Sequence, residues 1–118
     1  LTSALYREAV YLVSEGVAEV ADVDAVMSNG PGLRLALLGP HMNYHLGGGD
    51  GGYRSYLEHL GPSQEARWKT LGQTPLTKDL KEKLIHGIES QNPNMSELKT
   101  KRDNSLIKIL KTKKENKL

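Results

Sequence analysis

Apolar residues recur at helical spacing along most of the chain, in short runs that glycine and proline separate. The first run spans about residues 1–15, with Gly16 at the position of a C-terminal cap, and the second spans about residues 20–28. No stretch alternates between apolar and polar residues with the period of two that indicates a β-strand. The pattern predicts an all-α fold, organised as a single domain over residues 1–118.

The first predicted helix is apolar around most of its circumference. Arg7, Glu8 and Glu15 are its only charged residues, and a helix of this kind is buried on most of its sides. Leu1 already lies inside the apolar run, without a capping residue before it. We therefore expect the chain to be the C-terminal domain of a longer protein, with this helix covered by other parts of that protein.

Glycine and proline divide the middle of the chain. Gly30-Pro31-Gly32 predicts an irregular turn, which a short apolar segment at 33–38 follows. Gly39-Pro40 predicts the start of another helix, because proline suits the first helical position, and that helix should end at Gly47–Gly49. A further helix from about residue 52 to 60 is predicted to stop at the next such pair, Gly61-Pro62.

Two capped helices are predicted in the C-terminal third. Thr77 is a candidate N-cap for a helix over residues 78–89, and Asn94 with Glu97 resembles a capping box for the last helix. The stretch around Trp68 has no clear pattern. The last helix should turn its apolar residues toward the core: Leu98, Leu106, Ile109 and Leu110.

The amino-acid composition excludes some classes of chemistry and of binding partner. The chain has no cysteine, which excludes disulfides and thiolate chemistry and favours a cytoplasmic location. No apolar run reaches the roughly 18–20 residues that span a bilayer, so we expect no membrane partner. Lysine and arginine dominate from Lys99 onward. A basic tail can bind nucleic acid, but no aromatic residues alternate with these lysines, and a solvated helix end is the simpler interpretation.

Three groups of residues are candidates for catalysis or for metal or phosphate binding. His41 and His45 share a helix face, but Met42 occupies the place of the zincin glutamate and no third ligand is evident, so we predict no metal site. The glycines of 47–52 lack the Lys-Ser/Thr of a phosphate loop and predict a sharp interhelical turn. No serine, histidine and acidic residue are spaced as a catalytic set, so no catalytic residue is assigned.

Arg34 is the most distinctive charged residue. It follows the Gly30-Pro31-Gly32 turn and precedes an apolar run. Its guanidinium either bonds helix-end carbonyls or faces an anion, for which its fixed fork suits a carboxylate. The residues alone leave both roles open.

An ordered series of short motifs resembles a known family. These motifs are Leu1–Ala9, Val13–Ala18, Asp22-Val23-Asp24, Gly30-Pro31-Gly32-Leu33-Arg34, Gly39-Pro40, Gly47–Gly52 and Gly61-Pro62, with a weaker continuation at Leu76-Thr77 and Arg102-Asp103. Together they resemble the C-terminal domain of the 3-hydroxyacyl-CoA dehydrogenase family, over nearly the whole chain. Within it, the chain is most similar to the branch that contains L-carnitine dehydrogenase and lambda-crystallin (L-gulonate 3-dehydrogenase).

The resemblance implies a two-domain oxidoreductase that acts on a small hydroxy acid or a hydroxyacyl-CoA. Its N-terminal Rossmann domain, absent from this chain, would bind NAD and carry a catalytic His–Glu pair. This chain would be the helical domain that forms the homodimer and closes the substrate cleft. By itself it is expected to bind no NAD and to be inactive.

The resemblance also gives candidate substrate or interface residues, which are Arg34, Leu35, Leu38, Pro40 and Tyr44. In the branch that acts on free hydroxy acids, an Arg follows the glycine turn as Arg34 does. Carnitine-type members carry aromatics after that Arg, whereas this chain has leucines. An aromatic cage for a trimethylammonium group would then come from Tyr44, Tyr53 or the missing domain. The alternative function is a stand-alone helical interaction module with a basic tail.

Overall fold

Seven α-helices and one 3₁₀ turn follow one another along the chain, and the computed structural model describes all residues, 1–118. The helices are α1 (Thr2–Ser14), α2 (Val20–Asn29), α3 (Pro31–Leu37), α4 (Pro40–Gly47), α5 (Gly52–Trp68), α6 (Lys78–Glu89) and α7 (Met95–Glu115), with η1 (Gly49–Gly51) between α4 and α5. No strand is present, so the predicted all-α fold is confirmed. None of the helices is both long and apolar enough to cross a membrane.

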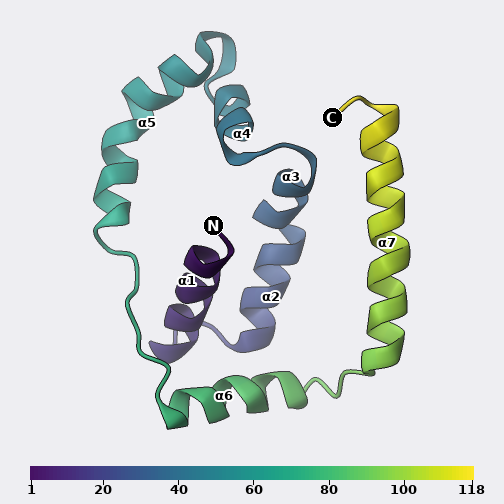
Figure 1. Cartoon of the computed structure of the whole chain (residues 1–118). Helices are drawn as coiled ribbons and strands as arrows, with labels where there is room; N and C mark the ends of the chain where they lie inside the picture. The colour runs from purple at the N-terminus through teal and green to yellow at the C-terminus, as the bar shows by residue number, and fades with distance from the viewer.

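Helices α1, α2 and α6 form the main core (Figure 1). Val13, Val20 and Val23 are buried together, and Leu12 and Leu84 pack against them. As predicted, Gly16 ends the first helix with a positive φ of 70°, and the amide of Val17 reaches back to the carbonyl of Leu12 at 3.0 Å. This turn brings α2 back against α1.

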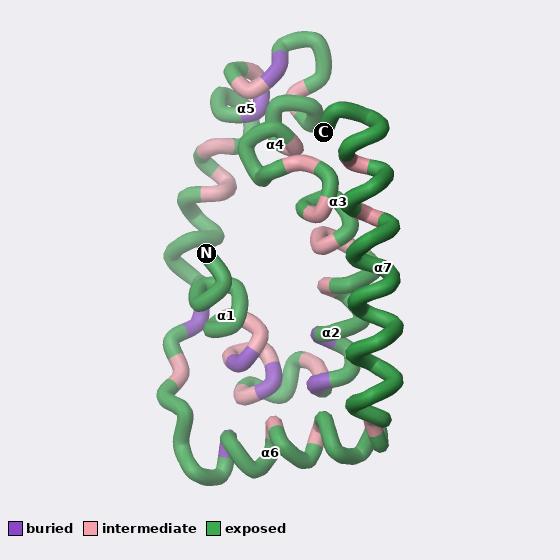
Figure 2. The backbone as a smooth tube through the Cα atoms, turned by 45° about the vertical axis from the view of Figure 1, so that its right-hand side comes forward, coloured by how far each residue is buried: buried purple, intermediate pink, exposed green.

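Within this chain the first helix is covered along only part of its length, and the rest of its predicted burial would need other parts of a longer protein. Helices α2 and α6 cover only its C-terminal half, where Val10 and Val13 are buried, whereas Leu5 and Tyr6 remain about half exposed. Figure 2 shows the same contrast, with buried residues gathered at one end of α1. The exposed half is therefore available to surfaces outside these 118 residues.

One predicted helix break is shorter than expected, and one does not occur. Helix α2 ends at Asn29, as predicted, with the irregular backbone confined to Gly30. Pro31 and Gly32 are the first residues of α3 rather than an irregular turn, because Pro31 takes the first helical position, where no amide is needed. Helix α5 continues through Pro62 to Trp68. Proline normally disfavours the helical conformation of the residue before it by contact with that residue's Cβ, and here that residue is Gly61, which has none.

The segment between α5 and α6 has no regular structure but is tied to α1. The amide of Gly72 donates to the carboxylate of Glu8 at 2.8 Å, and the hydroxyls of Ser14 and Thr74 lie 3.2 Å apart. The predicted Thr77 cap is confirmed, since its hydroxyl accepts from the amide of Leu80 at 3.2 Å. These contacts fix where α6 begins relative to α1.

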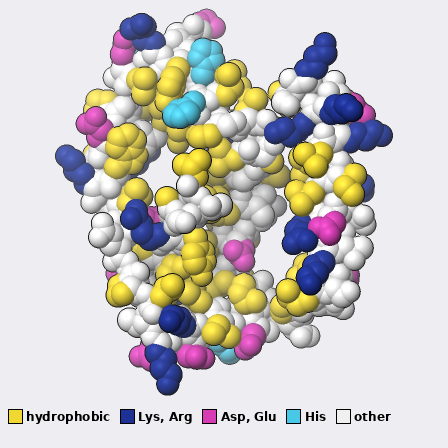
Figure 3. Space-filling view, in the orientation of Figure 1, with side chains coloured by type: hydrophobic (Ala, Val, Ile, Leu, Met, Phe, Trp, Pro, Cys, Tyr) yellow, Lys and Arg dark blue, Asp and Glu magenta, His cyan; other side chains and the backbone are white.

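Helix α7 stands beside the body without packing on it. The Asn94 side chain caps it, as predicted, by accepting from the amide of Glu97 at 3.0 Å. Its apolar residues do not face a core, contrary to the sequence prediction. Of the residues expected to face the core, Ile109 is partly buried. The other three are about half exposed or more: Leu98, Leu106 and Leu110. The space-filling view shows an opening between α7 and the other helices (Figure 3).

The molecule as a whole is flat and open. Its principal extents are 46 × 39 × 18 Å and its radius of gyration is 17.4 Å, whereas a compact domain of this length has about 13–14 Å. Only 8 of the 118 residues are buried. The chain thus leaves much apolar surface for contacts beyond itself.

Candidate functional site

Helices α4 and α5 form an antiparallel hairpin, and a glycine-rich turn joins them. The sequence prediction of a sharp turn with positive φ is confirmed at Gly49 and Gly52, whose φ angles are 60° and 59°. A Cβ on Gly48 would overlap the carbonyl oxygen of Gly52, so the backbone passes too close for any side chain there. The turn therefore lets the two helices approach each other closely enough for aromatic stacking.

Three tyrosines and a histidine form one stacked cluster inside this hairpin. The rings of Tyr44 and Tyr56 are nearly parallel, with centroids 4.5 Å apart, and Tyr53 lies 6.0 Å from Tyr56. His41 meets the edge of Tyr53, and its Nδ1 lies 2.9 Å from the Tyr53 hydroxyl. Tyr56 is buried and accepts a hydrogen bond from the amide of Gln64. The cluster holds α4 and α5 in a fixed register.

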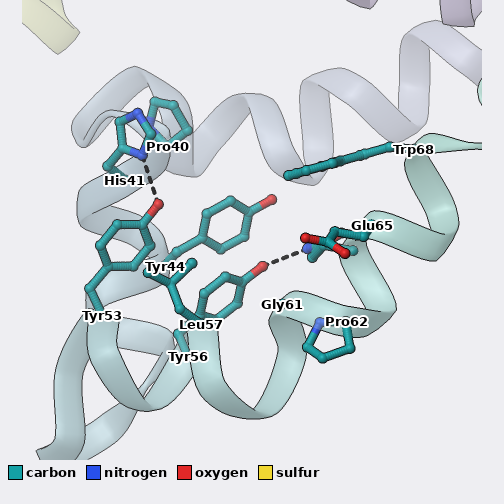
Figure 4. Close-up of a pocket in the computed structure, with 11 residues that line it drawn as sticks. Pro40, His41, Tyr44, Tyr53, Tyr56, Leu57, Gly61, Pro62, Glu65 and Trp68 are labelled. Carbon is teal, nitrogen blue, oxygen red and sulfur yellow. Dashed lines mark hydrogen bonds between the residues drawn. The ribbon is translucent and has the colours of Figure 1, made fainter.

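A pocket of about 590 Å³ opens beside this cluster (Figure 4), within the size range of small-molecule sites. Tyr44, Tyr53 and Tyr56 line one side of it, and Trp68 from the far end of α5 lines another. Trp68 can reach the pocket only because α5 continues past Pro62. The pocket is thus built by one hairpin, from residues 28 positions apart or less.

The charges around the pocket favour a cation. Glu65 is its only carboxylate, and no lysine or arginine is among its lining residues. The indole and phenol rings present π-faces, which attract a cation within about 6 Å of the ring centroid. A ligand with a positive charge spread over apolar groups would therefore satisfy both the aromatic walls and the carboxylate.

The structure brings together two of the five residues that the sequence indicated. Pro40 and Tyr44 line the pocket. Arg34, Leu35 and Leu38 lie on or just after α3 and do not. Arg34 is exposed, and its guanidinium has no hydrogen-bond or ion-pair partner within the chain.

A single side chain links Arg34 to the pocket hairpin. The Asn43 amide donates to the carbonyls of Leu38 at 2.7 Å and Gly39 at 3.1 Å, and lies 3.4 Å from the carbonyl of Arg34. Asn43 precedes the pocket residue Tyr44 on α4. The end of α3 that carries Arg34 is therefore braced against the helix that carries Tyr44.

The predictions for the two histidines and for cofactors can be compared with the geometry. His41 and His45 both use Nδ1 within the hairpin, toward the Tyr53 hydroxyl and the Tyr53 amide. No group of three or more potential metal ligands is present. A dinucleotide site needs a strand followed by a glycine turn and a helix, and a chain without strands does not fit it.

Sequence reasoning missed Tyr56, Glu65 and Trp68 as site residues. The signal was present in the helical period. On one continuous helix, residues 53, 56 and 68 fall within an arc of about 120°. Because the helix was predicted to stop at Gly61-Pro62, Trp68 was not placed on it, and its position on the same helix face as Tyr53 and Tyr56 was not recognised.

Comparisons with known proteins identify the family. The family model described as 3-hydroxyacyl-CoA dehydrogenase, C-terminal domain, matches residues 1–90. An L-carnitine dehydrogenase of Oceanobacillus iheyensis is 41% identical over 112 residues, which cover 93% of this chain and 36% of that protein. One of Staphylococcus epidermidis is 42% identical over 92% of this chain and 35% of its own length.

A third relative, an L-carnitine dehydrogenase of Nocardiopsis dassonvillei, is 37% identical over 98% of this chain and 36% of its length. The chain thus spans about a third of the length of the curated relatives that it matches. The family model ends before α7, whereas the relatives extend through most of it. This chain belongs to the 3-hydroxyacyl-CoA dehydrogenase family and corresponds to its C-terminal domain.

Proposed function

We propose that this chain is the substrate-cleft and dimerisation domain of an NAD-dependent dehydrogenase whose substrate is a carnitine-type 3-hydroxy acid. Such a substrate carries a quaternary ammonium group at one end and a carboxylate at the other. The observation that supports this choice is the aromatic pocket of Tyr44, Tyr53, Tyr56 and Trp68 with Glu65 beside it. The relatives named L-carnitine dehydrogenase support the same substrate class.

A quaternary ammonium group suits this pocket better than the other family substrate, a CoA thioester. The ammonium has no proton to donate, so it gains little from polar groups and much from aromatic faces, by about 0.5–2 kcal/mol per well-placed ring. A CoA thioester instead brings anionic phosphates, which call for lysine or arginine. The pocket offers neither residue type and would repel an anion through Glu65.

The opposite end of the substrate is assigned to Arg34. Its guanidinium is exposed and unpaired within the chain, and a planar fork binds a carboxylate through two parallel hydrogen bonds. Asn43 braces the end of α3 against α4, so Arg34 and Tyr44 sit on helices that are held together. The domain would thus recognise both charged ends of one zwitterion.

The reaction itself belongs to the rest of the protein. Bound to the rest of the protein, NAD⁺ would supply the hydride acceptor for C3 of the substrate, and loss of the hydroxyl proton to a base would leave a 3-oxo acid, NADH and a proton as products. This chain fits neither the dinucleotide nor an acid–base pair. Its own part in the reaction is to bind and orient the substrate and to exclude water from the cleft.

The proposal is tested by kinetics on the whole protein that carries this domain. The substrate pair is L-carnitine and 3-hydroxybutyrate, which share the hydroxy acid but differ in the ammonium group. Trp68→Ala should raise KM for carnitine by roughly 2- to 30-fold, the equivalent of about 0.5–2 kcal/mol. The same change should leave KM for 3-hydroxybutyrate unaltered.

Leu71→Ala provides a matched control, because Leu71 is an exposed apolar residue just beyond Trp68 that does not line the pocket. It should affect neither substrate. Equal kinetics of Trp68→Ala and the unmodified protein toward carnitine would reject the ammonium assignment. Absence of any NAD-linked oxidation of hydroxy acids would reject the enzyme function as a whole.

A further inference from the structure

His45 makes a hydrogen bond that crosses the glycine turn between α4 and α5. Its Nδ1 accepts from the backbone amide of Tyr53 at 3.0 Å. Because a backbone N–H can only donate, Nδ1 carries no proton in this arrangement and the ring proton lies on Nε2. The contact therefore fixes the tautomer of His45 as well as its orientation.

The amide that His45 binds is one that α5 cannot satisfy by itself. Tyr53 is the second residue of α5, and the first four amides of a helix have no intrahelical acceptor. The residue at the N-cap is Gly51, which has no side chain, and no side-chain cap is present at that position. The cap comes instead from the imidazole of the preceding helix, eight residues earlier.

The turn is shaped to admit the imidazole ring. A Cβ on Gly52 would lie 2.6 Å from the Cε1 of His45, so any side chain there would displace the ring. Gly52 also has a φ of 59°, a conformation that other residues adopt only at a cost. Two independent requirements, backbone conformation and space for His45, thus fall on the same glycine.

We propose that His45 is a positioning residue of the aromatic pocket, which acts by capping α5 and fixing Tyr53 and Tyr56 against Tyr44. The imidazole is not among the side chains that line the pocket. It holds the first turn of α5, which carries Tyr53 and leads into Tyr56, and both rings belong to the stacked cluster. This role rests on the proposed function only for the identity of the pocket's ligand.

The proposal distinguishes His45 from its neighbour His41 on the same helix. His41 lies in the pocket wall and meets the Tyr53 hydroxyl. His45 instead accepts a hydrogen bond from the backbone amide of the same tyrosine. One histidine therefore orients the ring of Tyr53, and the other fixes the position of the helix that carries it.

Three substitutions at His45 test this role in the whole protein that carries the domain. His45→Asn places an acceptor oxygen near the position of Nδ1, His45→Gln places it near that of Nε2, and His45→Ala removes it. The probe is tetramethylammonium, titrated by calorimetry. We expect Ala and Gln to weaken its binding by roughly 2- to 30-fold, the equivalent of a lost helix cap. Asn should retain binding within about twofold.

His59→Ala is the matched control, because His59 lies on α5, meets only the Ser55 carbonyl and does not line the pocket. It should bind tetramethylammonium like the unmodified protein. Equal binding by His45→Ala and the unmodified protein, or equal loss in Asn, Gln and Ala, would overturn the proposal.

A second measurement is independent of any ligand. In protein labelled with ¹⁵N-histidine and ¹⁵N-tyrosine, the His45 signals should show Nε2 protonated, and the Tyr53 amide should exchange slowly with solvent. In His45→Ala and His45→Gln that amide should exchange faster, while His45→Asn keeps the protection. If tetramethylammonium fails to bind the unmodified protein, the proposed substrate class is wrong, and these signals still decide the role of His45. A Tyr53 amide that exchanges equally in all variants would refute the cap.

Discussion

The α4–α5 hairpin and helix α7 each carry a row of apolar side chains, but only the hairpin packs its row against the same chain. In the hairpin, Tyr44, Tyr53 and Tyr56 stack on one another, and Tyr56 is buried. On α7, the side chains of Leu98 and Leu106 are 50% and 48% exposed. The apolar side chains of the hairpin are thus packed within the chain, whereas those of α7 are left exposed to solvent.

The two regions differ in how the chain holds them. The hairpin has a short glycine turn, the His45 cap and the hydrogen bonds of Asn43. Helix α7 is held to the body by the hydrogen bond from the Lys113 ammonium to the Ala36 carbonyl, at 2.8 Å. A helix of this length gains most of its stability from packing. The hairpin therefore can form a binding site within this chain, whereas α7 needs a further surface to complete it.

The sharpest contrast is expected in stability. Tyr56→Ala removes a buried ring from the hairpin and should lower the free energy of unfolding by about 3–5 kcal/mol. Ile107→Ala on α7, where the side chain is 64% exposed, should change it by no more than about 0.5 kcal/mol. Urea denaturation followed by circular dichroism measures both. Similar losses in the two variants would mean that α7 is packed as tightly as the hairpin.

The same contrast explains which parts of the fold the sequence predicted. Local signals were sufficient where a cap or turn is made by neighbouring residues, as at Gly16, Thr77 and Asn94. They failed where the outcome depends on tertiary contact. Periodicity assigned α7 an inward face, but periodicity cannot tell whether the surface that covers a face belongs to the same chain.

The site was predicted only in part for a related reason. Pro40 and Tyr44 were indicated by resemblance, and Tyr53 as a possible cage residue, and all three line the pocket. Trp68 was missed because proline was treated as an obligatory helix stop. The cost of an internal proline depends on its surroundings, and Gly61 before it removes part of the steric conflict.

Arg34 lies on α3, between the two regions, and its substitution tests whether the substrate spans from the hairpin toward α3. Arg34→Ala in the whole protein should lose about 2–5 kcal/mol of transition-state binding, because a partly desolvated carboxylate would lose its partner. That corresponds to a fall in kcat/KM of roughly 30- to several-thousand-fold. Arg34→Lys should recover only part, since an ammonium cannot form two parallel hydrogen bonds.

The NAD affinity of Arg34→Ala should be unchanged, because the proposed NAD site belongs to the other domain of the whole protein. If Arg34 instead serves an interface, the variant should melt at a lower temperature or dimerise less while KM for the acid remains that of the unmodified protein. Measuring KM, dimer affinity and melting temperature on one variant distinguishes the two roles. An unaltered KM would eliminate the contact with the carboxylate.

Helix α7 can be tested for a role in the proposed homodimer. Leu98→Gln with Leu106→Gln keeps helix propensity but makes the apolar face polar. If a second copy covers this face, burial of the remaining exposed halves is worth about 1.5–3 kcal/mol in each protomer, and so about 3–6 kcal/mol in the dimer. The double variant should then dimerise at least roughly 150-fold more weakly by sedimentation equilibrium. Ile107→Gln, about 100° around the helix from Leu106, is the control.

The smallest effect is expected at the hydrogen bond that joins α7 to α3. Lys113→Met keeps most of the apolar stem of the side chain but removes the ammonium that donates to the Ala36 carbonyl. Because this hydrogen bond is partly buried, its loss should cost about 0.5–1.5 kcal/mol locally. If it alone positions α7, amide exchange should accelerate along Met95–Glu115 and not in the hairpin. Lys111→Met on the same helix is the control. Lys111 forms only an exposed ion pair with Glu115, so its loss should leave amide exchange unchanged. Protection of α7 that survives the loss of Lys113 would show that another surface holds the helix, as dimerisation through its apolar face requires.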